Sequence, residues 1–191
     1  MTNKKTSIYD YDNDFAHYEL DEKERKKLGQ IWTPYSLIVK MMDKVKPSHW
    51  KDETRTNFDP TMGTGNIVIA MLYRRIVEYK QDPLKALKNT YGVELDQKTL
   101  DYAHKRIEKF MAHFTNFKKK VHEIVMKNFV CSDIFKWNVE KWRPMTPEEI
   151  ELYEKEKKEK KRKLEQEKNL ARFGLSKKSE EEIMAELGLV Y

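Results

Sequence analysis

The sequence predicts an α/β fold in which parallel strands are flanked by helices, as in one half of a doubly wound sheet. Three short segments with strand character end near Asp59, Glu94 and Cys131, and amphipathic helices separate them. Strand, helix, strand, helix, strand is the pattern of a βαβαβ unit. Residues 146–191 are rich in charge and poor in apolar side chains, which predicts a charged C-terminal helical tail.

Apolar side chains at helical spacing predict the helices of the α/β unit. The predicted segments are 34–46, 66–80, 82–88, 97–114 and 119–126. A turn is expected around Pro47, between the first of these helices and the first strand. A further short helix is expected over residues 21–28, ending at Gly29.

Composition excludes several classes of protein. The chain has 191 residues, of which 39% are hydrophobic and 12% aromatic, enough for a packed core. A single cysteine excludes a disulfide framework and a zinc site of several thiolates. No run of about 18 apolar residues occurs, so no membrane partner is expected. The N-terminal residues lack the apolar part of a secretory signal, and we expect a cytoplasmic protein.

Charge is distributed unevenly along the chain. The net charge is +6, yet residues 146–191 contain 11 basic and 12 acidic side chains, so the positive excess belongs to the preceding residues. The charged segment opens with a predicted capping box at Thr146–Glu149, with Pro147 at the first helical position. Its helix is expected to end at Gly174, and a second short helix to begin at Ser179.

The sharpest signal is a glycine turn between the first strand and the next helix, over Asp59-Pro60-Thr61-Met62-Gly63-Thr64-Gly65-Asn66. Glycines allow a tight turn and a close approach of the backbone to a ligand. A carboxylate at the strand end suits a cationic ligand group rather than a pyrophosphate. The Gly-Lys-Ser/Thr of a P-loop is absent, and Val68 replaces the third glycine of a dinucleotide fingerprint. The alternative is a structural turn without a ligand.

Acidic residues also follow the second and third strands. Glu94 is placed to accept hydrogen bonds from ribose hydroxyls, the alternative being a charge that faces solvent. Asp96 is expected to cap the next helix. Asp133 can accept a hydrogen bond from an exocyclic amine, and Ile134 or Phe135 can pack on an aromatic ring. Doubly wound sheets bind ligands at these strand ends, so three acids there predict a ligand site.

Four motifs occur in the order found in one known family. They are Gly29-Gln30-Ile31-Trp32-Thr33-Pro34, the glycine turn, Gly92-Val93-Glu94-Leu95-Asp96, and Ser132-Asp133-Ile134-Phe135. Over residues 29–137 the chain resembles the S-adenosylmethionine-binding half of gamma-type N6-adenine DNA methyltransferases. It is also similar to small methylase-like proteins carried by phages. The resemblance implies a partial Rossmann-like, S-adenosylmethionine-dependent methyltransferase fold.

The resemblance also implies a role for the motif residues. Thr33 and Pro34 line the methionine end of S-adenosylmethionine, and Asp59 lies near its ammonium group. Glu94 binds the ribose hydroxyls and Asp133 the adenine amine. The implied cofactor-binding residues are Thr33, Pro34, Asp59, Pro60, Gly63, Gly65, Asn66, Glu94, Asp133, Ile134 and Phe135.

The catalytic motif of these methyltransferases is absent. They hold the flipped adenine with an Asn/Asp/Ser-Pro-Pro-aromatic motif, and this sequence has no Pro-Pro pair. Asn138 beside Trp137 or Trp142 is a weak substitute, so no catalytic residue is assigned. We expect methylation of adenine in DNA only if a partner chain or a second copy supplies the motif. The alternative is a non-catalytic module that binds the cofactor or a partner.

These observations divide the chain into three segments: an N-terminal polar extension (1–28), a methyltransferase-like cofactor-binding domain (29–145) and the charged helical tail (146–191). The histidines at 104, 113 and 122 lie on different helix faces, so no metal site is expected. Candidate contacts to DNA phosphates are Lys105, Arg106, Lys109, Lys118, Lys119, Lys120, Lys127, Lys136, Lys141 and Arg143. The alternative for these side chains is a solvated helix face.

Overall fold

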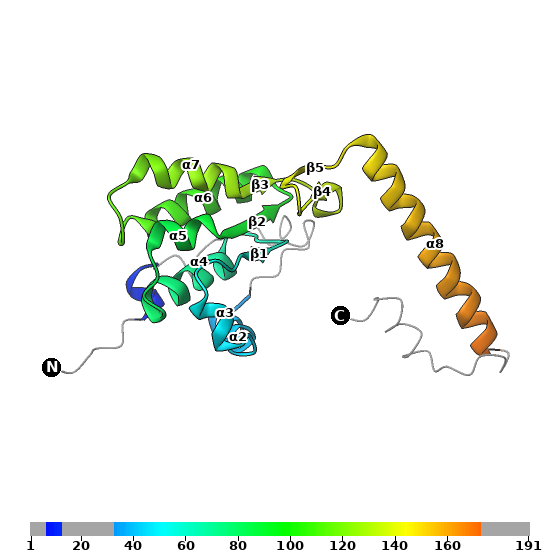
Figure 1. Ribbon diagram of the computed structural model, residues 1–191, viewed down its shortest axis with the longest axis horizontal. Helices are drawn as coiled ribbons and strands as arrows, with labels where there is room; N and C mark the ends of the chain where they lie inside the picture. Colours follow the sequence, from blue (N-terminus) through cyan, green and yellow to red (C-terminus); the bar gives the residue numbers. More distant parts are fainter. Residues whose placement is uncertain (1–6, 13–32, 173–191) are drawn as a thin grey trace. The chain divides into compact units, whose positions relative to one another are not determined.

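The structure is a computed structural model that describes residues 7–12 and 33–172 (Figure 1). Its described residues fall into two compact units, one ending at Phe135 and the other beginning at Lys136. The predicted divisions after residues 28 and 145 stay predictions. The helices predicted over residues 21–28 and from Ser179 lie outside the described residues, as does the predicted helix end at Gly174.

A three-stranded parallel sheet forms the centre of the first unit. It contains β1 (Asn57–Asp59), β2 (Thr90–Glu94) and β3 (Phe129–Cys131), with β2 in the middle. The register places Asp59 opposite Gly92 and Glu94 opposite Cys131. Because the strands are parallel, their carboxyl ends share one edge, here called the carboxyl edge. The predicted mixed α/β unit with parallel strands flanked by helices is confirmed.

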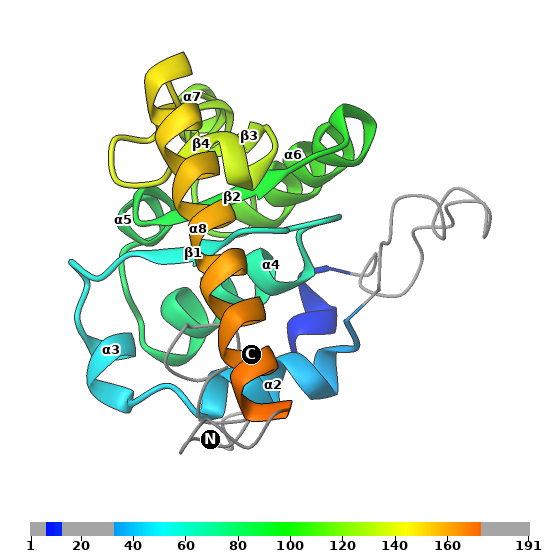
Figure 2. The same ribbon diagram turned by 90° about the vertical axis from the view of Figure 1, so that its right-hand side faces the viewer.

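Helices surround this sheet. They are η1 (Ile8–Asp10), α2 (Tyr35–Asp43), α3 (Pro47–Lys51), α4 (Asn66–Tyr73), η3 (Arg74–Glu78), α5 (Pro83–Lys88), α6 (Gln97–Met111), α7 (Lys118–Asn128) and η4 (Ile134–Lys136). α2 packs on α4, and α7 packs on both α5 and α6 (Figures 1 and 2). The predicted cap of α6 is confirmed, because the Asp96 carboxylate accepts a hydrogen bond from the Thr99 N–H at 2.7 Å.

Two helices differ from the expectation. The turn expected around Pro47 is the start of α3, where proline fits because the first helical N–H needs no partner within the helix. The helix expected over 66–80 changes after Tyr73 into the π-helix η3. There the fully buried Arg75 donates to the Gln81 side chain at 2.7 Å and to two backbone carbonyl groups. These long-range contacts leave no mark in hydrophobic periodicity.

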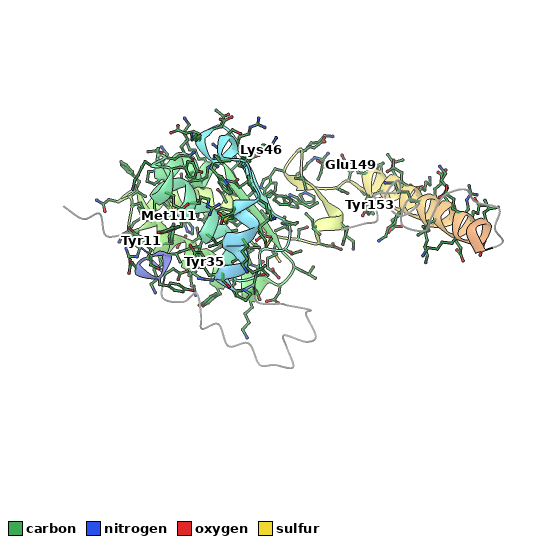
Figure 3. The ribbon with its side chains drawn as sticks, turned by 90° about the horizontal axis from the view of Figure 1, so that it is seen from below. Tyr11, Tyr35, Lys46, Met111, Glu149 and Tyr153 are labelled. Carbon is green, nitrogen blue, oxygen red and sulfur yellow. The ribbon has the colours of Figure 1, made fainter. Side chains whose placement is uncertain are left out.

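The core of the first unit is apolar and continuous. Tyr11, labelled in Figure 3, packs against it, with ring centroids 6.3 Å from Phe110 and 5.0 Å from Phe114. Fully buried apolar side chains come from η1, α2, α4, α5, α6 and β3: Ile8, Ile38, Ile69, Leu72, Leu87, Ile107, Phe110, Met111 and Phe129. Segments far apart in the sequence are thus joined by burial of apolar surface.

The second unit consists of a small hairpin and a long helix. β4 (Trp137–Asn138) pairs antiparallel with β5 (Arg143–Pro144), and α8 spans Pro147–Arg172. The hairpin is not foreseen from the sequence. The predicted capping box is present, because the Glu149 N–H donates to Thr146 Oγ1 at 3.3 Å and the Thr146 N–H donates to Glu149 Oε2 at 2.9 Å. Hydrogen bonding, first from Arg143, lowers the pKa of Glu149, labelled in Figure 3, to about 2.

Among the helices within residues 7–12 and 33–172, none combines the length and the apolar character needed to cross a bilayer.

Candidate active site at the carboxyl edge

The glycine turn follows β1 at the carboxyl edge. Gly63 and Gly65 adopt left-handed backbone conformations, with φ of +53° and +88°. Other residues rarely adopt these conformations, so this turn explains the choice of glycine at both positions. The Met62 N–H donates to the Val93 carbonyl at 2.9 Å, which ties the turn to β2. Gly65 is the N-cap of α4 and provides no side-chain cap, so the first N–H groups of this helix lie at the carboxyl edge.

Asp59 carries a buried carboxylate that is only half satisfied. Asp59 is 5% exposed, and its Oδ1 accepts a hydrogen bond from the Thr61 N–H at 3.2 Å. Oδ2 is buried and has no hydrogen-bond partner among the residues that the structure describes. Burial, with a smaller contribution from the negative charge of Glu94, raises the pKa of Asp59 to about 6. A cationic ligand group would satisfy both the open oxygen and the charge.

Glu94 closes onto the glycine turn. Its Oε2 accepts a hydrogen bond from the Gly63 N–H at 2.8 Å, and its Oε1 accepts one from the Asp96 N–H at 3.0 Å. The residue is 7% exposed, so the alternative of a strand-end charge facing solvent is wrong. A carboxylate oxygen has two lone pairs, and each oxygen therefore keeps an acceptor site beyond its backbone contact. The structure thus brings Asp59, Glu94 and the glycine turn together.

Asn66 connects the turn to the residues before α2. Its Nδ2 donates to the Thr33 carbonyl at 3.4 Å, and its Oδ1 accepts from Arg106 Nη1 at 2.5 Å. Pro34, which is exposed, is the N-cap of α2, and the helix begins at Tyr35 without a side-chain cap. The helix predicted over 34–46 therefore begins one residue later than expected, because Pro34 has the extended backbone (ψ 143°) of a residue outside the helix.

Arg106 is the site-supporting residue that sequence reasoning misplaced among the phosphate contacts. It is 3% exposed, and its Nη2 lies 2.6 Å from Asp12 Oδ2. Its Nη1 also donates to the Thr64 carbonyl at 3.1 Å, within the glycine turn. A signal was available, because Arg106 lies three residues after Ala103 and four before Phe110, on the apolar stripe of α6. An arginine on such a stripe indicates a buried ion pair.

The residues after β3 are more open. The Ser132 N–H donates to the Glu94 carbonyl at 2.9 Å, which keeps this segment beside β2. Asp133 and Ile134 are half-buried, and Asp133 Oδ1 accepts from the Phe135 N–H at 3.0 Å. Phe135 is 57% exposed. The structure therefore brings Asp133 to the β2–β3 side of the carboxyl edge. Pro60 is exposed in the turn after β1.

Asn138, the weak substitute for a catalytic residue, is engaged within its own unit. Its Nδ2 donates to Glu149 Oε1 at 3.2 Å, and its Oδ1 accepts from the Lys141 N–H at 2.9 Å. Trp137 and Trp142 pack edge to face, with ring centroids 5.5 Å apart. Both ends of the Asn138 amide are thus engaged locally, by the hairpin and the first turn of α8.

Comparisons with known proteins agree with this geometry. A profile of the family described as N-6 DNA Methylase matches residues 11–142, which is more than half of the chain. Comparison with curated proteins and with solved structures found no match. The matched range includes the sheet, the glycine turn, both buried carboxylates and the Asp12–Arg106 pair. The chain belongs to the N-6 DNA methylase family, as a DNA methyltransferase-like protein.

Proposed function

We propose that the protein binds S-adenosylmethionine at the carboxyl edge and serves as the cofactor half of an N6-adenine DNA methyltransferase. The open Oδ2 of the buried Asp59 carries this proposal. A carboxylate held in this state favours an ammonium group, and the α-ammonium of S-adenosylmethionine is such a group. When bound, the cofactor supplies an electrophilic methyl group on its sulfonium sulfur.

Each side chain of the edge has a role in this proposal. Ionised Asp59 holds the ammonium, and the glycine turn lets the backbone approach the amino-acid moiety closely. Glu94 uses its remaining lone pairs to accept hydrogen bonds from the ribose hydroxyls. Asp133 accepts from the adenine amine, while Ile134 or Phe135 covers the ring. Thr33 and Pro34 lie at the methionine end, where Asn66 already contacts the Thr33 backbone.

Calorimetric titration with S-adenosylmethionine tests the binding site. We expect saturable binding by the wild-type chain, and Asp59→Asn should weaken the affinity by at least tenfold because the amide cannot neutralise the ammonium. Asp101→Asn is the matched control, since Asp101 is an exposed carboxylate on α6. Absence of both heat and a thermal shift at millimolar cofactor in the wild-type chain would refute the proposal.

Transfer of the methyl group is proposed to require an acceptor motif from a partner chain or a second copy. The engaged amide of Asn138 and the absence of a Pro-Pro pair favour this division of labour. The same observations favour the second candidate, a non-catalytic cofactor- or partner-binding module. Labelled methyl transfer to DNA, assayed with increasing concentrations of the chain alone, separates the cases. A rate of methyl transfer proportional to the protein concentration contradicts completion by a second copy. A rate proportional to the square of the concentration supports it.

A further inference from the structure

A second feature lies at the other end of α6, away from the carboxyl edge. An open pocket of about 530 Å³ forms between the last turns of α6 and the first turns of α7. Its lining includes four lysines, Lys105, Lys109, Lys118 and Lys119. Ala112 and Val121 contribute apolar surface to the same pocket. This set of residues is called the lysine pocket below.

The charge of the lysine pocket is strongly one-sided. Its lining residues include four lysines and one acidic residue, Glu108. Glu108 Oε1 lies 2.7 Å from His122 Nδ1, so the one carboxylate is already engaged. No ion pair to Lys105, Lys118 or Lys119 is formed by the part of the chain that the structure describes. The ammonium groups of these three lysines therefore have no counter-charge among the described residues.

The positive charges in the first turn of α7 are unfavourable for that helix. Lys118, Lys119 and Lys120 occupy this turn, no acidic residue shares it, and Phe117 provides no side-chain cap. Cations near a helix N-terminus oppose the helix dipole. Local choices that oppose the fold without an internal gain indicate a function. Among the described residues, no acidic side chain in that turn offsets this cost.

The surroundings of the lysine pocket indicate which kind of anion would fit it. Phe117, next to the lysines, has 66% of its surface exposed, and Met126 on the same helix has 52%. Basic side chains with an exposed aromatic ring suit a polynucleotide, whose phosphates meet the lysines and whose bases can stack on the ring. An inorganic anion has no base that could stack on the exposed Phe117 ring.

We propose that the lysine pocket is a contact site for the phosphate backbone of DNA, separate from the carboxyl edge. α6 begins at Gln97, three residues after Glu94, and Lys109 of the lysine pocket follows twelve residues later on the same helix. At 1.5 Å per residue this is about 18 Å along the helix, or roughly five base pairs of B-form DNA. DNA anchored here can extend toward the carboxyl edge. The inference extends the proposed function, since it names where its DNA is held.

Fluorescence anisotropy with a labelled 20-base-pair duplex tests the site without cofactor. Lys118→Gln with Lys119→Gln should weaken binding about tenfold near 0.1 M salt and reduce the slope of log K against log salt by about two. The control is Lys160→Gln with Lys161→Gln, an adjacent, exposed pair on α8 that removes the same charge. It should leave both quantities unchanged. Lys105→Gln with Lys109→Gln provides a second pocket variant from the other helix.

Three results would overturn the proposal: no duplex binding by the wild-type chain, equal losses in the pocket and α8 variants, or displacement of DNA by polyglutamate at matched charge, which indicates an acidic protein partner instead. A single strand of the same sequence shows whether stacking on Phe117 adds to the phosphate contacts. Cofactor titration of the pocket variants separates this inference from the proposed function. Unchanged S-adenosylmethionine affinity with weakened DNA binding supports both, and failure of cofactor binding alone leaves the DNA result standing.

Discussion

Asp12 and Arg106 form an ion pair in which the Arg106 Nη2 lies 2.6 Å from the Asp12 Oδ2 and each side chain is 2% exposed. The two residues lie 94 positions apart in the sequence. The same guanidinium donates to the Thr64 carbonyl and to Asn66. The pair therefore fixes the N-terminal segment against the glycine turn.

Asp12→Ala should lower the free energy of unfolding by about 3–5 kcal/mol, because it leaves the buried guanidinium without its counter-charge. Asp43→Ala is the matched comparison. Asp43 lies at the same 2.6 Å from Arg74, but its side chain is 61% exposed, and the expected loss is under about 1 kcal/mol. Urea unfolding of both variants measures the difference. Equal losses would show that burial does not decide the strength of these pairs.

Glu94→Gln is expected to lower the stability of the chain although the two side chains have nearly the same shape. Both Glu94 oxygens accept from backbone N–H groups, those of Gly63 and Asp96. A glutamine amide has one acceptor oxygen, so its NH₂ group must face one of these donors. We expect a loss of about 1–3 kcal/mol in the free energy of unfolding and weaker cofactor binding. Glu123→Gln, the same change at an exposed position on α7, controls for the loss of charge. An unaltered stability of Glu94→Gln would contradict the observed contacts.

Asp59 makes stability depend on pH in a direction opposite to that of most carboxylates. Burial raises its pKa in the folded chain to about 6 from the ordinary 3.8. Between these values the folded chain holds the proton and the unfolded chain has lost it, so the free energy of unfolding falls as pH rises. The resulting destabilisation is absent below about pH 4 and reaches at most about 3 kcal/mol above pH 6. The difference between wild-type and Asp59→Asn unfolding curves from pH 3 to 8 isolates it.

The same group predicts the pH dependence of cofactor affinity. An ammonium group pairs with the ionised carboxylate, so binding of S-adenosylmethionine should weaken about tenfold per pH unit below pH 6. Binding should release a proton near that pH, which calorimetry in buffers of different ionisation enthalpy detects. Asp59→Asn should show neither effect. A pH-independent affinity in the wild-type chain would contradict the assignment of the ammonium to Asp59.

The strands and the acids at their ends could be predicted from the sequence, because each depends on local pattern. β2 and β3 have the predicted bounds, and Asp59 and Glu94 lie where parallel strands place them. The hydrogen bond from Gly63 to Glu94 could not be predicted, because it depends on the register between β1 and β2. Arg106 was misplaced because its partner, Asp12, lies in an N-terminal segment without a clear period. Two-residue strands such as β4 and β5 are too short to carry a pattern.

Gly92 lies next to Met62 of the glycine turn, and its lack of a side chain leaves space for the Met62 side chain. A Cβ at position 92 would lie 2.5 Å from the Met62 Sδ and 3.1 Å from Phe129 Cδ1. Gly92→Ala should therefore lower the free energy of unfolding by about 1–3 kcal/mol through overpacking. Gly63→Ala provides the contrast, since nothing lies within 4 Å of its Cβ and its cost comes only from φ of +53°.

A double-mutant cycle separates these two causes. Met62→Ala removes the sulfur that Gly92→Ala would meet, so the two changes together should cost less than the sum of their separate effects, by about 0.5–3 kcal/mol. Met62→Ala combined with Gly63→Ala should be closer to additive, because backbone strain at Gly63 does not depend on the Met62 side chain. Additive losses for the Gly92 pair would mean that position 92 is constrained by Phe129 and the backbone instead. Because the Met62 side chain is buried against Gly92, a smaller side chain leaves a cavity beside the glycine turn and should loosen the site that Asp59 and Glu94 share.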